Sequence, residues 1–151
     1  MDSFPAPPTA AIAGHPLHAT LVPFPIVCFT LALVTDVLYS RTANMMWQNF
    51  SAWLLFAGLV VGGFAALFGL IDLLARGSVR RRRGAWVHGI GNLVVLVLAF
   101  FNNLVHAADG WTAVVPDGLV LSAATVLVLI ATVWLGRAMV FRDAIGVSRH
   151  D

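Results

Sequence analysis

Four long apolar runs constrain this chain more than any other feature. They cover residues 19–39, 51–75, 86–107 and 118–140, and each is near the roughly 20 residues that an α-helix needs to cross a bilayer core. Only 11% of the 151 residues are charged and the mean hydropathy is +0.89, whereas about 25% of residues are charged in soluble domains. The pattern predicts an all-α integral membrane protein, an up-down-up-down four-helix bundle within residues 19–140.

The segments outside the bundle are short. Residues 1–18 are rich in Pro and Ala and contain no Arg or Lys, so we expect a flexible lead-in and not a cleaved signal peptide. Residues 141–151 are expected to form a tail. Pro23 and Pro25 lack backbone donors, so the first helix should kink near its start or begin late.

The arginines predict the orientation of the bundle. The chain has no Lys, and its nine Arg residues are distributed unevenly. Five lie between the second and third runs, Arg137 lies near the end of the fourth run with Arg142 and Arg149 after it, and only Arg41 lies in the other two loops. The positive-inside rule therefore places the middle loop, the tail and, with four spans, both termini in the cytoplasm. Because the basic charge follows topology, we expect the lipid bilayer and not nucleic acid as the partner.

Polar and small residues recur along one face of each run with the four-three spacing of a heptad. We expect these four faces to point into the bundle, because a polar side chain facing lipid is costly. On the second run the face includes the GxxxG pair Gly58 and Gly62, which could serve inside the bundle or in a homodimer. The faces are His18, Val22, Pro25, Phe29, Ala32 and Asp36; Ser51, Leu55, Gly58, Gly62, Ala65, Gly69 and Asp72; His88, Asn92, Val95, Ala99, Asn102 and His106; and Gly118, Ser122, Thr125, Leu129, Thr132 and Gly136.

Depth divides the polar residues into two layers. His88 and His106 are separated by about 27 Å along a helix, so they cannot share a site. The expected cytoplasmic layer contains His15, His18, Asp72, His88, Asn92 and Arg137, and the expected outer layer contains Asp36, Asn102, Asn103 and His106.

Three segments together resemble a known bacterial family. GHPLHATLVPFPIVCFTLALVTDVLY, GLIDLL after the GxxxG pair, and VHGIGNL are similar to the predicted membrane proteins catalogued as domain of unknown function 2231, over nearly the whole chain. The resemblance implies a four-helix fold in the bacterial inner membrane. It also implies that members of the family occur alone or beside redox modules such as Rieske domains. It implies no established activity.

A redox cofactor is one hypothesis for the cytoplasmic layer. Heme b needs two imidazoles at similar depth and cations for its propionates. His18 and His88 are the candidate axial ligands, and Arg137 is a candidate propionate partner. Such a protein would pass electrons to a redox partner protein. In a second version, His15, His18, Asp72 and His88 bind one transition metal, because mixed imidazole and carboxylate ligation suits zinc, iron or copper.

The alternative hypothesis is structural. His88 could hydrogen-bond Asp72, and His106 could pair with Asp36. Asn92 and Asn102 could join helices in the same way. The protein would then be a scaffold or partner-binding module without a ligand. Solute or proton transport ranks below both, because Val95 and Ala99 interrupt the polar line between His88 and His106. An enzyme is not favoured either, since the chain has no Glu and no hydrolase or transferase motif.

Overall fold

The computed structural model describes residues 11–12, 15–108 and 114–143, and the side chains of 17–108 and 114–138. Within these residues the chain is almost entirely helical. Two antiparallel two-residue strands, with Ile12 paired to His15, precede the first helix. The elements are β1 (Ala11–Ile12), β2 (His15–Pro16), α1 (Leu17–Leu21), α2 (Pro23–Thr42), α3 (Met45–Ala75), α4 (Gly77–Arg80), α5 (Arg83–His106), η1 (Val114–Gly118) and α6 (Leu119–Asp143). Segment η1 is kinked, because Val115 has extended backbone angles (φ −119°, ψ 123°).

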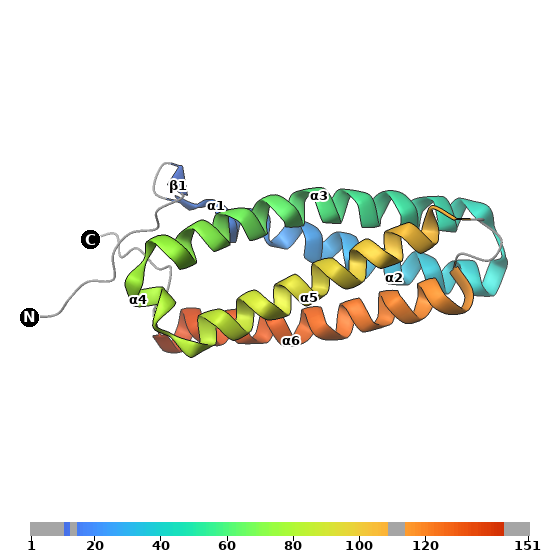
Figure 1. Cartoon of the computed structure of the whole chain (residues 1–151). Helices are drawn as coiled ribbons and strands as arrows, with labels where there is room; N and C mark the ends of the chain where they lie inside the picture. The colour runs from blue at the N-terminus through green and yellow to red at the C-terminus, as the bar shows by residue number, and fades with distance from the viewer. Residues whose placement is uncertain (1–10, 13–14, 109–113, 144–151) are drawn as a thin grey trace, which may run out of the picture.

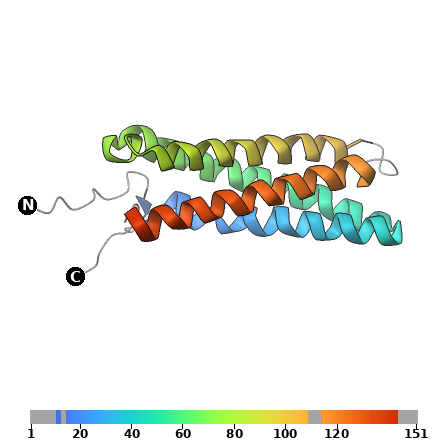
Figure 2. The ribbon, with the colours of Figure 1, turned by 90° about the horizontal axis from the view of Figure 1, so that it is seen from below.

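The long helices form the predicted up-down-up-down bundle (Figures 1 and 2). Four segments are long and apolar enough to cross a membrane: Leu17–Thr42, Met45–Ala75, Arg83–His106 and Val114–Ala138. Helix α2 packs against α3 and α6, and α5 packs against the same two helices. Because α2 and α5 share both neighbours, they face each other diagonally across the interior of the bundle.

Local sequence explains where the first two spans begin. Pro23 and Pro25 lack N–H donors, and the first span divides accordingly into α1 and α2 around Val22. Val22 itself keeps helical backbone angles (φ −53°, ψ −38°), so the span is interrupted there only in its hydrogen bonding. Helix α3 begins at Met45, six residues before its apolar run, because the Asn44 side chain caps it by accepting a hydrogen bond from the Met46 N–H at 3.0 Å.

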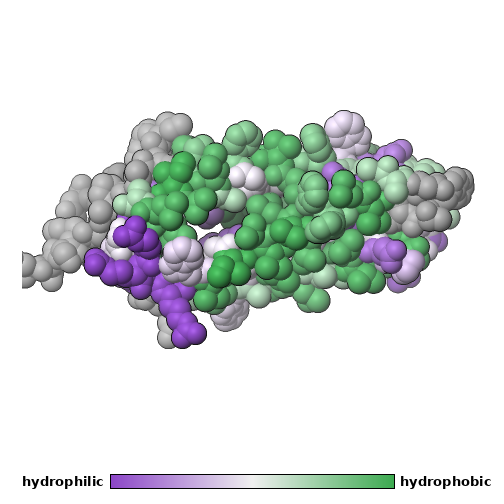
Figure 3. Space-filling model, viewed as in Figure 1, coloured by the Kyte–Doolittle hydropathy of each residue, from purple (hydrophilic) through white to green (hydrophobic). Residues whose placement is uncertain are grey.

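The predicted inward faces form the core. The arginine end of the bundle is the end where α3 stops and α5 starts, next to Arg76 and Arg80–Arg83. Apart from residues at this end, the members of all four faces are buried. The hydrophobic centre consists of six side chains from four helices. They are Phe29, Ala32, Leu55, Val95, Ala99 and Leu129. The opposite faces expose large side chains such as Trp53 and Trp134, and hydrophobic residues cover most of the bundle surface seen in Figure 3. Such an outer surface is unstable in water and suits lipid.

The GxxxG pair is used inside the bundle. A Cβ atom on Gly58 would lie 2.5 Å from Phe29 of α2, and one on Gly62 would lie 3.0 Å from Leu96 of α5 and 3.4 Å from Pro25. The missing side chains thus let α3 approach both neighbours closely. These two glycines are consequently not available on the lipid-facing surface.

Candidate functional site

A buried polar layer, here called the far layer, joins all four long helices at the end away from the arginines. Asp36 of α2 contacts His106 of α5, with 2.9 Å between Oδ1 and Nε2. Ser122 of α6 donates to Asp36 Oδ2 at 2.5 Å, and Asn102 Nδ2 donates to Ser122 at 2.7 Å. All four residues are at most 2% exposed. The pairing of His106 with Asp36 considered from the sequence is therefore present.

The hydrogen bonds determine how many protons this pair holds. His106 Nδ1 lies 2.9 Å from the main-chain carbonyl oxygen of Asn102. A carbonyl only accepts, so Nδ1 carries a hydrogen. The contact between Nε2 and Asp36 then requires one further hydrogen, located on either the imidazole or the carboxyl group. In both arrangements the pair is neutral overall, which lowers the cost of burying it in a membrane.

Helix α3 joins the far layer through Gln48, which the sequence analysis did not select, and through Ser51, which belongs to the predicted inward face. Gln48 donates from Nε2 to the His106 carbonyl oxygen at 2.8 Å, and Ser51 and Thr35 share a hydrogen bond of 2.6 Å. Gln48 lies before the predicted second span, so it was not considered as an intramembrane group. The Asn44 cap was the available signal that the helix begins earlier.

The second layer, here called the arginine-end layer, is built around two histidines on diagonal elements. His18 of α1 has its Nδ1 2.8 Å from the carbonyl oxygen of Ala65 in α3. His88 of α5 has its Nδ1 3.0 Å from the carbonyl oxygen of Thr132 in α6. Each imidazole is thereby held by a main-chain group of a neighbouring helix. The sequence suggested Asp72 as the hydrogen-bond partner of His88, and this was wrong. The two ring nitrogens of His88 contact Thr132 and Asn92.

These bonds fix the chemical form of both rings. A carbonyl oxygen cannot donate, so Nδ1 of His18 and of His88 carries the hydrogen. In the neutral imidazole, Nε2 then has the lone pair and is the atom able to bind a metal. The Nε2 of His88 lies 2.9 Å from Nδ2 of Asn92, one turn along α5, and accepts a hydrogen bond from it.

The two rings lie close together and pack against glycines. Their centres are 6.2 Å apart and their planes are perpendicular, at 89°. A Cβ on Gly69 would lie 2.8 Å from His18 Nδ1, and a Cβ on Gly136 would lie 3.0 Å from His88 Cε1. Glycine at these two positions therefore gives each ring the space it occupies.

The two layers differ in how tightly they are enclosed. The residues of the far layer are almost completely buried, whereas His18, His88 and Asn92 are only partly buried and Gly89 is exposed. Figure 1 shows α3 and α5 diverging toward the arginine end, and Figure 3 shows the surface hollowed between them there. The arginine-end layer is thus the less tightly enclosed of the two layers.

The other predicted ligands do not join the two histidines. Asp72 is partly buried and Arg137 is exposed, and each has an interaction partner. The side chain of His15 lies outside the described residues. Among the side chains that are described, no three histidine, cysteine, aspartate or glutamate groups gather to hold a metal ion. The predicted mononuclear site of His15, His18, Asp72 and His88 is therefore not formed by its described members.

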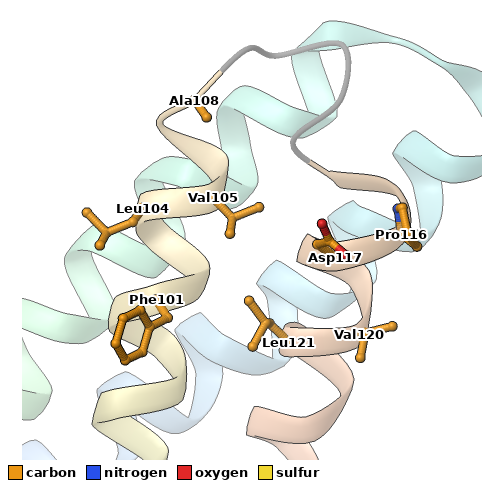
Figure 4. A pocket seen from close by; sticks show the side chains of 8 residues that line it. All are labelled: Phe101, Leu104, Val105, Ala108, Pro116, Asp117, Val120 and Leu121. Atoms are coloured by element: carbon orange, nitrogen blue, oxygen red, sulfur yellow. The ribbon is translucent and has the colours of Figure 1, made fainter.

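A groove of about 800 Å³ opens beside the far layer, between α5 and the start of α6 (Figure 4). Its lining is apolar except for the carboxylate of Asp117, which is exposed in η1. The lining residues are Phe101, Leu104, Val105, Ala108, Pro116, Asp117, Val120 and Leu121. None of them belongs to the hydrogen-bonded layers.

Comparison with known proteins identifies a family and no closer relative. A family model described as "Predicted membrane protein (DUF2231)" matches residues 14–149, which is nearly the whole chain. No curated protein and no solved structure matches the chain.

Proposed function

This chain belongs to the DUF2231 family of predicted membrane proteins, and from the geometry of its arginine-end layer we propose that it is a membrane-embedded electron carrier. In this proposal His18 and His88 are the axial ligands of heme b. The observation that carries it is the pairing of two imidazoles whose centres are 6.2 Å apart and whose Nδ1 atoms are both bound to carbonyls.

The distance between the ring centres is the one expected for a metal between two imidazoles, and it is also that of an edge-to-face ring pair. A metal–nitrogen bond of about 2.0–2.1 Å, with about 1.1 Å from nitrogen to ring centre, puts the centres roughly 6.4 Å apart in a linear arrangement. A tetrahedral angle would reduce this separation to roughly 5.2 Å. The 6.2 Å between His18 and His88 is close to the linear value. A heme would be held by His18 and His88 and would need no third protein ligand.

The surroundings of the rings also support the proposal. Histidines that bind metals usually donate their other ring N–H to a carbonyl or carboxylate, which fixes both the tautomer and the ring orientation. Ala65 and Thr132 supply such carbonyls here. Arg137 follows Gly136, the residue that packs against His88, and is the proposed propionate partner. Asn92 occupies His88 Nε2 by a hydrogen bond, so its side chain must rotate away when the ligand enters.

A bound heme would supply one-electron chemistry, and the protein residues would hold it in place and restrict its contact with water. Neither layer offers a nucleophile with access to a substrate, so we propose electron transfer to a redox partner protein and no bond change. We further propose that the arginine end faces the cytoplasm of a bacterial inner membrane, because Arg76 and Arg80–Arg83 cluster there.

The test is an absorption spectrum of protein purified in detergent from heme-replete cells, oxidised and then reduced with dithionite. We expect a Soret band and sharp reduced α and β bands at one heme per chain. His88→Gly should lose them, and added imidazole should restore them, because the free base can replace the missing ligand. His106→Gln is the control, since it removes a buried histidine of the far layer and should keep the spectrum.

A glycine pair sharpens this experiment. Gly136→Ala should weaken heme binding, because its Cβ would lie 3.0 Å from the His88 ring, while Gly89→Ala has nothing within 4 Å and should not. If well-folded protein stays colourless even after titration with hemin, the proposal is wrong. The bonds of His18 and His88 to carbonyls of neighbouring helices then favour the alternative, a scaffold or partner-binding module whose polar layers only join helices.

A further inference from the structure

Five arginines gather where α3 ends, α4 turns and α5 begins. They are Arg76, Arg80, Arg81, Arg82 and Arg83, here called the arginine surface, and they appear as a hydrophilic patch beside the apolar bundle in Figure 3. The last four are exposed. Because α3 and α5 are both membrane-spanning segments, this patch lies at the level where apolar side chains give way to water.

The helices that carry these guanidinium groups supply few side-chain acceptors for them. Asp72 is the only acidic residue on α3, α4 and α5. Arg80 donates one hydrogen bond, from Nη1 to the Leu74 carbonyl oxygen at 3.3 Å. The Nε of Arg76 is buried and has no hydrogen-bond partner in the described part of the chain. An unpaired buried donor is costly, and a phosphate oxygen forms strong charge-assisted bonds with such groups.

Apolar side chains continue directly from the patch along the helices. Ile71 and Leu74 are 40% and 51% exposed on the last turns of α3, and Val87 is 45% exposed on the first turns of α5. Trp86 is 43% exposed and donates from Nε1 to the Arg80 carbonyl oxygen at 2.9 Å, as an aromatic anchor at a membrane interface would. A free anion would use only the arginines, whereas a lipid would also cover these apolar side chains.

We propose that the arginine surface is a binding site for an anionic diacyl phospholipid such as phosphatidylglycerol. The headgroup phosphate pairs with Arg76, Arg80 and Arg81, and the acyl chains lie along Ile71 and Leu74. This inference does not depend on heme binding, because it uses none of the residues of the arginine-end layer.

The experiment uses the full chain in bilayers and fluorescence quenching by brominated lipids. The chain has five Trp residues, so quenching is measured for the unaltered chain and for Trp86→Phe. The difference between the two is the quenching of Trp86 at the site. Brominated phosphatidylglycerol should quench Trp86 at a lower mole fraction than brominated phosphatidylcholine. Each basic residue near an anionic surface contributes about 1 kcal/mol, or about fivefold in affinity. Arg80→Gln combined with Arg81→Gln should therefore reduce the preference about 25-fold.

Two variants and one competitor distinguish the possible results. Arg80→Lys with Arg81→Lys keeps the charge and should keep most of the preference, and Arg41→Gln, an exposed arginine at the other end, should not change it. Equal quenching by the two lipids would overturn the proposal. If inorganic phosphate displaces brominated phosphatidylglycerol, the site binds free phosphate and the lipid assignment is wrong.

Discussion

The Asp36–His106 pair should stabilise the far layer by its hydrogen bonds and not by its charge. Replacing Asp36 with Leu removes two interhelical bonds, to His106 and Ser122. Interhelical hydrogen bonds in membranes average about 0.6 kcal/mol and reach about 1.7, and buried groups left unpaired add about 1–3 kcal/mol. We therefore expect Asp36→Leu to lower the free energy of unfolding by about 2–4 kcal/mol.

Asp36→Asn should cost much less, less than about 1 kcal/mol. His106 Nδ1 donates to the Asn102 carbonyl, so Nε2 can accept a hydrogen bond from the new amide N–H. The amide oxygen can still accept from Ser122. The substitution thus keeps both interhelical bonds while removing the carboxyl group.

The measurement is equilibrium unfolding in mixed micelles of nonionic detergent and dodecyl sulfate, followed by tryptophan fluorescence. Asp117→Leu is the control, because Asp117 is exposed at the same end of the bundle and should change stability by less than about 0.5 kcal/mol. Equal losses for Asp36→Asn and Asp36→Leu would refute the reasoning, because the carboxyl group itself would then be required. No loss for either would show that the pair does not hold the bundle together.

Three further predictions concern packing, the ligand nitrogen and topology. Gly58→Ala should destabilise the bundle by about 1–3 kcal/mol, because its Cβ would meet Phe29, while Gly63→Ala has open space and should be neutral or slightly stabilising in the same unfolding assay. Asn92→Leu removes the hydrogen bond to His88 Nε2, and hemin titration should give binding equal to or tighter than that of the unaltered chain; weaker binding would mean that Asn92 supports the ligand. A fluorescent protein that folds only in the cytoplasm should be active when fused to the C-terminus, and a phosphatase that is active only after export should be inactive there. The opposite pattern would contradict the orientation.

Much of the fold could be predicted because a membrane simplifies the problem. Each helix must turn its polar and small residues away from lipid, so one spacing rule finds the inward face. Pro25, Phe29, Ala32 and Asp36 follow this rule on α2, and all four are buried. The prediction needed no knowledge of neighbours, because the lipid surrounds every helix in the same way.

The partners of the polar groups were harder to predict. Pairing of His106 with Asp36 could be considered because both residues lie at the same depth on inward faces. The partners of His18 and His88 are main-chain carbonyls, and every residue has one, so the sequence does not distinguish Thr132 from its neighbours. The choice depends on the rotation and axial offset of α6 relative to α5. Those values follow from packing, including the close contact of Gly136 with His88.

The unequal closure of the two ends would let the bundle combine stability with the proposed ligand site. Asp36, His106 and Ser122 join α2, α5 and α6 at the far end, and the apolar centre around Phe29 lies between the two layers. The arginine-end layer makes fewer hydrogen bonds between helices. Its histidines bond to carbonyls through Nδ1, and the bond of His18 to Ala65 does not use Nε2 of His18. Helices fixed firmly at one end can separate at the other without loss of the core. A ligand inserted between His18 and His88 would therefore displace Asn92 and leave the rest of the bundle as it is.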